Sequence, residues 1–188
     1  KTRIGDADVT AGGNVTLTSN VDVSTDGDAI TAAGGILGGL VGAIADSNTK
    51  PTVNTYIDNG ATVNATGAVN LLSTVDNDSD ANTTGIGAGL LGAGASLAYA
   101  TIEGSTKTYV SGAVPAAASL QIAAKDVSDA DTDSLAVAGG IVSGSGSEAK
   151  SKANRTVNAY LSGGTASVGT SGSPIAGDAV IRAESTTD

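Results

Sequence analysis

Apolar and polar residues alternate with a period of two at four places along the chain, and the four segments start 54, 51 and 59 residues apart. Such alternation is typical of a β-strand that buries one face. The residues expected to point inward are Val15 and Leu17, Val69 and Leu71, Leu120 and Ile122, and Ala179 and Ile181. The pattern therefore predicts strands at Asn14–Ser19, Ala68–Ser73, Ser119–Ala124 and Asp178–Ala183.

Two other landmarks keep a constant distance from the first three strands. A glycine-flanked apolar pair begins 21 residues after the first inward residue, and a tyrosine lies 41, 40 and 40 residues after it. Three landmarks in one register indicate an internal repeat of about 54 residues, and they predict equivalent surroundings for the three tyrosines. The pairs are Ile36-Leu37, Leu90-Leu91 and Ile141-Val142, and the tyrosines are Tyr56, Tyr109 and Tyr160, with Tyr99 outside the set.

The repeat divides the whole chain into a single array. Its ends fall inside a unit, because Thr2–Gly13 resembles the close of a repeat and Asp178–Asp188 resembles the opening of another. We therefore expect a segment of a longer array, or a protomer whose ends are completed by neighbours. The predicted parts are the end of a preceding unit (1–13), unit 1 (14–67), unit 2 (68–118), unit 3 (119–177) and the start of a further unit (178–188).

Composition favours strands over helices. The chain has 27 Gly and no Phe, Trp, Met, Cys or His, so its core must consist of small and aliphatic side chains. Ile30–Ala45 is uncharged, but a membrane helix needs about 20 apolar residues, and the matching Gly139–Asn154 is polar. A soluble helix is disfavoured because each interior Gly costs about 1 kcal/mol relative to Ala. Strands and turns with closely approaching backbones fit the composition better.

We expect an all-β fold, a parallel β-solenoid built from repeats of about 54 residues. Three strands per repeat would give coils of about 18 residues, roughly ten coils in all, and a rod of about 48 Å at about 4.8 Å per coil. Stacking of this kind pairs every backbone edge except those at the two ends. The alternative is an antiparallel β-sandwich or meander with long strands.

The segments around two of the tyrosines, Asn48–Gly60 (NTKPTVNTYIDNG) and Asn154–Gly164 (NRTVNAYLSGG), carry a family resemblance. With the strand pattern and the Gly/Ala/Val-rich middle of each unit, they resemble the repeats of giant Gram-negative filamentous adhesins of the leukotoxin and filamentous-haemagglutinin type. The resemblance covers essentially the whole chain, although unit 2 departs from it at Lys107. It implies a right-handed parallel β-helix, export to the bacterial cell surface, and a role as stalk, filament or adhesive fibre.

An acidic segment follows the first strand of each unit and is the strongest chemical feature of the chain. The acidic residues 9, 11 and 13 positions after the first inward residue have the parity opposite to that of Val15 and Leu17, so they should point outward. Oxygen ligands at this density suit Ca²⁺, but a solvated face that prevents lateral aggregation is the simpler interpretation. The candidate metal ligands are Asp26, Asp28, Asp78, Asp80, Asp129, Asp131 and Asp133.

Other chemistry is disfavoured by the residues that the chain lacks. Without His or Cys there is no Ser–His or Cys–His nucleophile, and zinc binding is unexpected, so we do not expect an enzyme. The net charge of −10 repels nucleic acid and anionic membranes. The repeated tyrosines are expected to cap the core, with glycan binding as the alternative, because several coils would separate them.

These observations lead to an expected function. The chain should be a shaft, spacer or filament subunit of an extracellular fibrous surface protein or adhesin. Its expected partners are further copies or a longer chain, joined end to end through open strand edges, and a host or matrix glycan or protein. The rival function is a Ca²⁺- or glycan-binding adhesive module that uses the acidic face.

Overall fold

The computed structural model describes residues 1–168 and 177–187, which form strands and turns without a helix. Every strand pairing among them is parallel. The all-β prediction is therefore confirmed, and the antiparallel alternative is wrong. The strands are β1 (Thr2–Ile4), β2 (Asp8–Ala11), β3 (Val15–Thr49), β4 (Thr52–Ile57), β5 (Thr62–Ala65), β6 (Ala68–Val110), β7 (Ala113–Ala117), β8 (Ser119–Gly139), β9 (Val142–Leu161), β10 (Ala166–Val168) and β11 (Ala179–Thr187).

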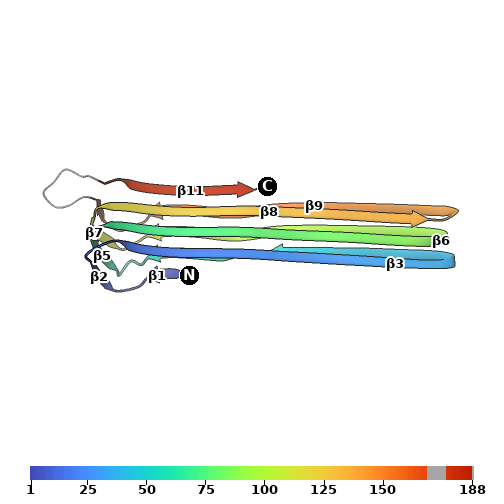
Figure 1. Ribbon diagram of the computed structural model, residues 1–188, viewed down its shortest axis with the longest axis horizontal. Coiled ribbons are helices and arrows are strands. Elements are labelled where there is room, and N and C mark those ends of the chain that lie inside the picture. The colour runs from blue at the N-terminus through green and yellow to red at the C-terminus, as the bar shows by residue number, and fades with distance from the viewer. Residues whose placement is uncertain (169–176, 188) are drawn as a thin grey trace.

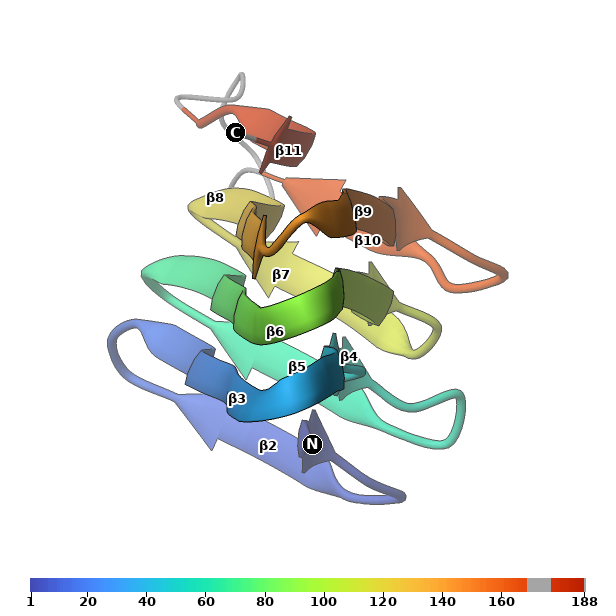
Figure 2. The same cartoon turned by 90° about the vertical axis from the view of Figure 1, so that its right-hand side faces the viewer.

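Each strand pairs with its equivalent in the next unit, in the register that the sequence predicts. Val15 lies beside Val69, Val69 beside Leu120, and Leu120 beside Ala179. One repeat therefore makes one layer, and the layers stack on one another (Figure 2). The described residues contain no helix that is long and apolar enough to cross a membrane.

The expected coil of about 18 residues is wrong. Strand neighbours are a whole repeat apart, so the chain makes a few wide layers and not about ten narrow coils. The longest dimension consequently runs along the strands, across the stacking direction (Figure 1). The prediction failed because the Gly/Ala-rich middle of each unit forms extended strands, whereas coils of 18 residues would need several turns there.

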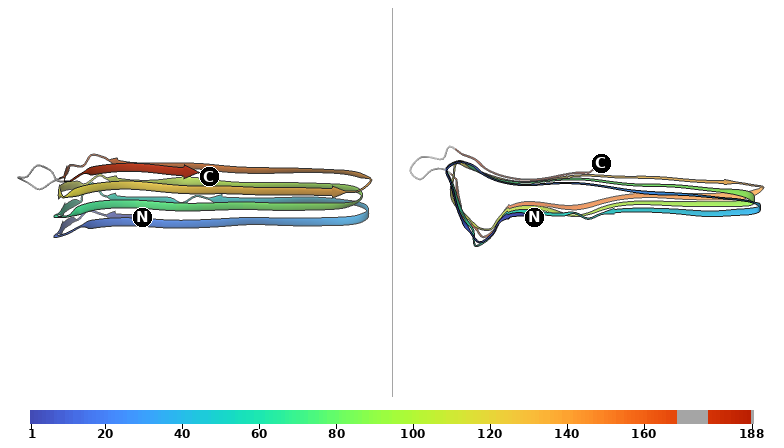
Figure 3. Two further views of the ribbon diagram at one scale, coloured as in Figure 1. Left: turned by 45° about the horizontal axis from the view of Figure 1, so that its top comes forward. Right: turned by 60° about the horizontal axis from the view of Figure 1, so that its bottom comes forward.

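Each complete layer consists of two long limbs and a short base. In unit 1 the chain runs outward from Val15 to a turn at Ile36-Leu37, returns to Thr49, and then closes through β4 and β5 (Figure 3). Units 2 and 3 repeat this path through β6 and β7 and through β8, β9 and β10. The base strands form their own four-stranded sheet in the order β10-β7-β5-β2.

The interior changes along the layer from aliphatic to nearly bare backbone. At the base, Leu71, Ile57 and Val114 belong to a fully buried aliphatic cluster that runs through successive layers. Farther out along the limbs the core consists mainly of alanines, among them Ala81 and Ala98. Toward the turn the inward positions become glycine, and the two limbs approach so closely that even a Cβ atom would collide with the facing backbone.

Buried hydroxyl groups separate these apolar regions. Ser19, Thr55, Ser73 and Thr108 form a chain of hydrogen bonds of 2.7–2.9 Å that crosses between limbs and between layers. Thr108 begins the chain by donating to Ser73, and Ser19 continues it by donating to Thr2 at 2.7 Å. Each hydroxyl can donate once and still accept, so the chain satisfies polar groups that would otherwise be costly to bury.

Candidate functional site

The acidic residues form straight rows on the outer face of the outgoing limbs. Asp26 lies beside Asp80 and Asp80 beside Asp131, each one strand spacing away, which is about 4.8 Å. On either side are the rows Ser24–Asp78–Asp129 and Asp28–Asn82–Asp133. All seven predicted residues point outward as expected, and six of them are exposed, with Asp80 half-buried. We call these three rows the acidic face.

Asp80 stands at the centre of the acidic face. Partial burial raises the pKa of its carboxyl group, and the charges of Asp78, Asp131, Asp26 and Asp129 raise it further. Like charges directly opposite one another on neighbouring strands destabilise a sheet. The acidic face therefore carries a repulsion that is largest at its centre.

The geometry does not converge on a preformed metal centre. Ca²⁺ takes six to eight oxygen ligands at 2.3–2.6 Å, whereas carboxylates in parallel rows approach a cation from one side of a flat surface. Within residues 1–168 and 177–187, no group of three or more acidic side chains is arranged to hold a metal ion. A cation on this face would keep much of its water.

Replacing Asp80 by asparagine should stabilise the protein at neutral pH. The change removes the central charge of the row, and Asn82 shows that an amide fits a neighbouring row. We expect the free energy of unfolding to rise by roughly 0.2–1 kcal/mol, the size of a cross-strand pair, as measured by urea denaturation.

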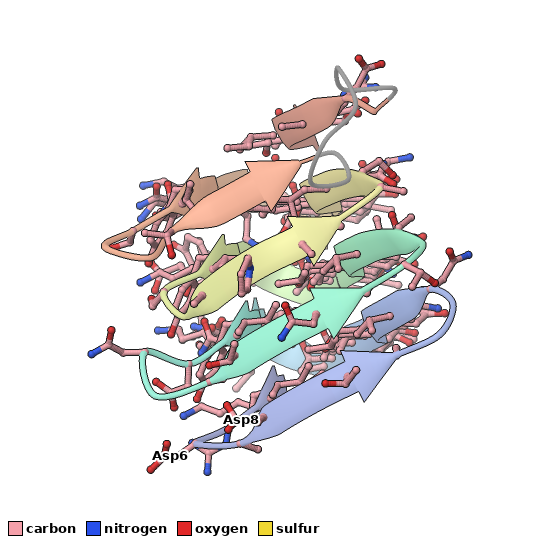
Figure 4. All side chains as sticks on the ribbon, turned by 90° about the vertical axis from the view of Figure 1, so that its left-hand side faces the viewer. Asp6 and Asp8 are labelled. Carbon is pink, nitrogen blue, oxygen red and sulfur yellow. The ribbon has the colours of Figure 1, made fainter. Side chains whose placement is uncertain are left out.

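The pH dependence of this gain follows from the direction of the pKa shift. Because the folded state raises the pKa of Asp80, the wild type is relatively more stable when this carboxyl group is protonated and loses that stability as pH rises through the folded pKa. The advantage of Asp80→Asn should therefore disappear below the ordinary carboxyl pKa of 3.8. Asp8→Asn on β2, at the base and away from the acidic face (Figure 4), is the control and should show no such gain. An equal gain in both variants would contradict the repulsion in the row.

A buried ionic cluster in unit 3 is absent from the sequence predictions. Asp126 and Arg155 pair at 2.6 Å with side chains that are 0% and 1% exposed. Arg155 also donates to the carbonyl oxygens of Pro51 and Glu103 at 2.9 and 2.7 Å, and Thr106 donates to Asp126 at 2.7 Å. The pair therefore joins the two limbs across the interior, where its polar partners satisfy both charges.

The signal for Asp126 was present in the alternation. Asp126 lies six residues after Leu120, an even distance that gives it inward parity. Val21 and Val75 occupy the equivalent positions in the first two units. Arg155 has no such signal, because the equivalent residue of unit 2 is Gly104, which has no side chain. Gly104 adopts a positive φ of 118°, which the repeat pattern does not predict.

The three repeated tyrosines form one continuous stack. The rings of Tyr56 and Tyr109 are 4.8 Å apart at an angle of 4°, and those of Tyr109 and Tyr160 are 5.0 Å apart at 3°. Their predicted equivalence is confirmed, and Tyr99 is outside the set, beside Asp46 and Lys150. The expected separation by several coils is wrong. Since the ring faces contact one another within the stack, most of the aromatic surface is not available to a sugar, and Tyr160 at the end of the stack is 37% exposed.

The outer face of the return limbs carries both signs of charge. Glu103 lies between Lys50 at 3.0 Å and Lys152 at 3.3 Å, and hydrogen bonds from these two lysines, with their charges, lower the pKa of its carboxyl group. The side chains of both lysines are more than half exposed. This face therefore contrasts with the acidic face on the opposite limb, and each such exposed pair contributes little to stability.

Comparisons of the chain with protein-family models, with curated proteins and with solved structures find no match.

Proposed function

We propose that the chain is a segment of a parallel β-solenoid of the right-handed β-helix type, and that it serves as a shaft, spacer or filament subunit of an extracellular fibrous surface protein or adhesin. One observation carries this proposal: each unit is a single layer that pairs in register with the next. Each layer pairs with one neighbour through one set of strand edges and presents the opposite set to the next layer. Such stacking can extend without limit, which suits a stalk or fibre.

The resemblance to filamentous adhesins supports the same proposal. The two segments that carry it, Asn48–Gly60 and Asn154–Gly164, contribute Tyr56 and Tyr160 to the stack. Their shared sequence therefore corresponds to a shared position in every layer, as expected for a long repetitive protein. A location at the bacterial cell surface follows from the family resemblance.

Assembly would use the same parallel ladder. Among the described residues, β3 pairs with β6 alone and β11 with β8 alone, so each has a free strand edge. We propose that further layers join at these edges, from other copies or from continuation of the polypeptide. The net charge of −10 and the lack of His and Cys support a structural role over catalysis, nucleic-acid binding or membrane insertion.

Electron microscopy of the purified chain tests this proposal directly. Rods or filaments that lengthen with protein concentration would support it, and light scattering should show growth over time. A strictly monodisperse particle at high concentration, with no growth, would contradict open-ended stacking.

A second candidate function is weak binding of divalent cations by the acidic face. The observation that favours it is the row of Asp26, Asp80 and Asp131 on adjacent strands, in which like charges oppose one another. A divalent cation between adjacent rows would offset this repulsion. Such binding could stiffen the shaft or bridge it to an anionic glycan.

Millimolar Ca²⁺ should then raise the melting temperature, and a chelator should reverse the rise, because a ligand that binds only the folded state stabilises it. For a chain of this length each kcal/mol corresponds to about 2–4 °C. Asp80→Asn and Asp131→Asn should reduce the Ca²⁺ response, whereas Asp8→Asn should leave it unchanged. A melting temperature unaffected by Ca²⁺ would leave the acidic face with a solvation role alone.

A further inference from the structure

The apolar pairs that mark each repeat meet at the far end of the limbs. Ile36 and Leu37, Leu90 and Leu91, and Ile141 and Val142 lie at the turns of successive layers, opposite the base. Their exposures range from 48% for Leu90 to 92% for Ile36. We call these six residues the crest. An exposed aliphatic strip of this kind is unusual, because soluble monomers rarely expose large contiguous apolar patches.

The crest adjoins a shallow apolar groove. The groove has a volume of about 590 Å³, and glycine and alanine form much of its lining, with Leu40, Leu91 and Val142 at its sides. Leu91 and Val142 thus belong to both features. A ridge beside a groove on one patch is self-complementary: the ridge of one molecule can enter the groove of a second, and the reverse contact forms at the same time.

Electrostatics permit close approach of two copies at the crest and oppose it across the acidic face. Every charged residue lies at least six positions from a crest residue in the sequence, and six strand residues span about 20 Å. The Debye length at physiological salt is only about 8 Å, so two crests can meet with their negative charges largely screened. No charged group would need to be desolvated.

Exposure and periodicity also fit a second copy. The crest and Leu40 are seven aliphatic residues that are 48–92% exposed, and a contiguous apolar patch of this kind is typical of the core of a protein–protein interface. Successive crest pairs are separated by one strand spacing, about 4.8 Å, and the crest of another copy has the same spacing. A lipid surface fits less well, because the crest carries no aromatic residue and no flanking Lys or Arg within six positions.

From this geometry we propose that the crest and its groove dock against the crest and groove of a second copy, which pairs two stacks side by side. This interface is separate from the free strand edges and would hold lateral pairs of shafts together. It forms without new strand pairing, so it does not depend on end-to-end growth.

Sedimentation velocity of the full chain, at concentrations from micromolar to submillimolar, tests the proposal. The wild type should show a species of twice the 17.9 kDa mass. Leu91→Glu places a charge at the centre of the crest and should raise the dimer dissociation constant by roughly thirtyfold or more, as expected for a hot-spot residue. Val180→Glu is the control for the crest contact, because Val180 is a 45% exposed aliphatic residue on β11, away from the crest. It should leave the side-by-side dimer intact, whatever its effect on end-to-end growth at the β11 edge.

Disulfide trapping provides an independent readout, since the chain has no cysteine. Leu90→Cys, in the central layer, should form covalent dimers under mild oxidation, and Val180→Cys should not. Circular dichroism checks that each variant is folded. Lack of a dimer, equal weakening by both Glu variants, or trapping at Val180→Cys alone would overturn the proposal. The proposal would also be overturned if the wild type formed no dimer but bound neutral phosphatidylcholine vesicles, and if Leu91→Glu abolished that binding. If Leu91→Glu loses the side-by-side dimer but still grows end to end, the crest contact and the end-to-end contact are separate, as proposed.

Discussion

Replacing Asp126 by valine should lower the free energy of unfolding by about 3–5 kcal/mol, because it leaves the buried Arg155 charge without its partner. The guanidinium group of Arg155 contacts both carboxylate oxygens, at 2.6–3.2 Å, and has almost no exposure to water. Removal of the acid therefore leaves a cation in a site with little solvent access. The loss should appear as an earlier midpoint in urea denaturation with an unchanged slope.

The repeat itself supplies the matched control. Unit 2 has Val75 where unit 3 has Asp126, and Gly104 where unit 3 has Arg155. The double variant Asp126→Val/Arg155→Gly therefore installs a pair that this fold already accommodates. Removing both charges together avoids the unpaired buried cation, but glycine leaves the space of the guanidinium group unfilled, so we expect the double variant to recover only part of the loss. A double variant no better than the single one would show that Asp126 acts mainly through Thr106 and its other neutral partners.

A double-mutant cycle with Arg155→Gly separates these contributions. Contacting residues in one network couple by about 0.5–3 kcal/mol, and this pair should be at or above the upper end. The coupling should change little with salt, since both groups are buried, whereas the exposed pair of Glu103 with Lys152 should weaken as salt screens it.

The register of the fold could be predicted from sequence, because it depends on local alternation that recurs. Val15, Val69 and Leu120 mark the same point of three units, and the structure places them side by side. The outward direction of Asp26 and Asp80 followed from the same parity. In these strands one face is apolar and the other polar, so a shift by one residue would expose the core.

The length of the limbs could not be predicted, because the alternation disappears where both faces are apolar. Leu40 points outward and is 81% exposed, while Val41 beside it is buried. A run with apolar residues on both sides carries no period of two, and its glycines suggest turns. Their actual role, to let two limbs pack with almost no side chain between them, depends on the facing strand and is not visible in local sequence.

The buried ion pair was only half visible for a related reason. Parity assigns Asp126 to the interior, but nothing near it in the sequence identifies its partner, which lies 29 residues away. Gly104 makes room for that partner, since a Cβ atom there would overlap the guanidinium group of Arg155. Predicting such a cluster requires knowledge of which layers are adjacent.

The thin interior near the turn makes a sharp prediction about glycine. Gly39 is buried between the limbs, and a Cβ atom on it would lie 2.7 Å from the carbonyl oxygen of Ala33 and 2.5 Å from that of Ala88. Both obstacles are backbone atoms, so they cannot move aside as a flexible side chain could. Gly39→Ala should therefore force the limbs apart and lower the free energy of unfolding by about 1–3 kcal/mol, as overpacking does.

Gly42→Ala is the matched control, three residues farther along the same strand β3. Gly42 is exposed, and a Cβ atom on it would meet no atom of the described residues within 4 Å. Because glycine in a strand loses more conformational freedom on folding than alanine, this variant should be stabilised by about 0.5–1 kcal/mol. Urea denaturation of the two variants should thus give shifts of opposite sign for the same chemical change. Equal shifts would mean that the limbs are not in close backbone contact at Gly39, which would contradict the thin interior at this position.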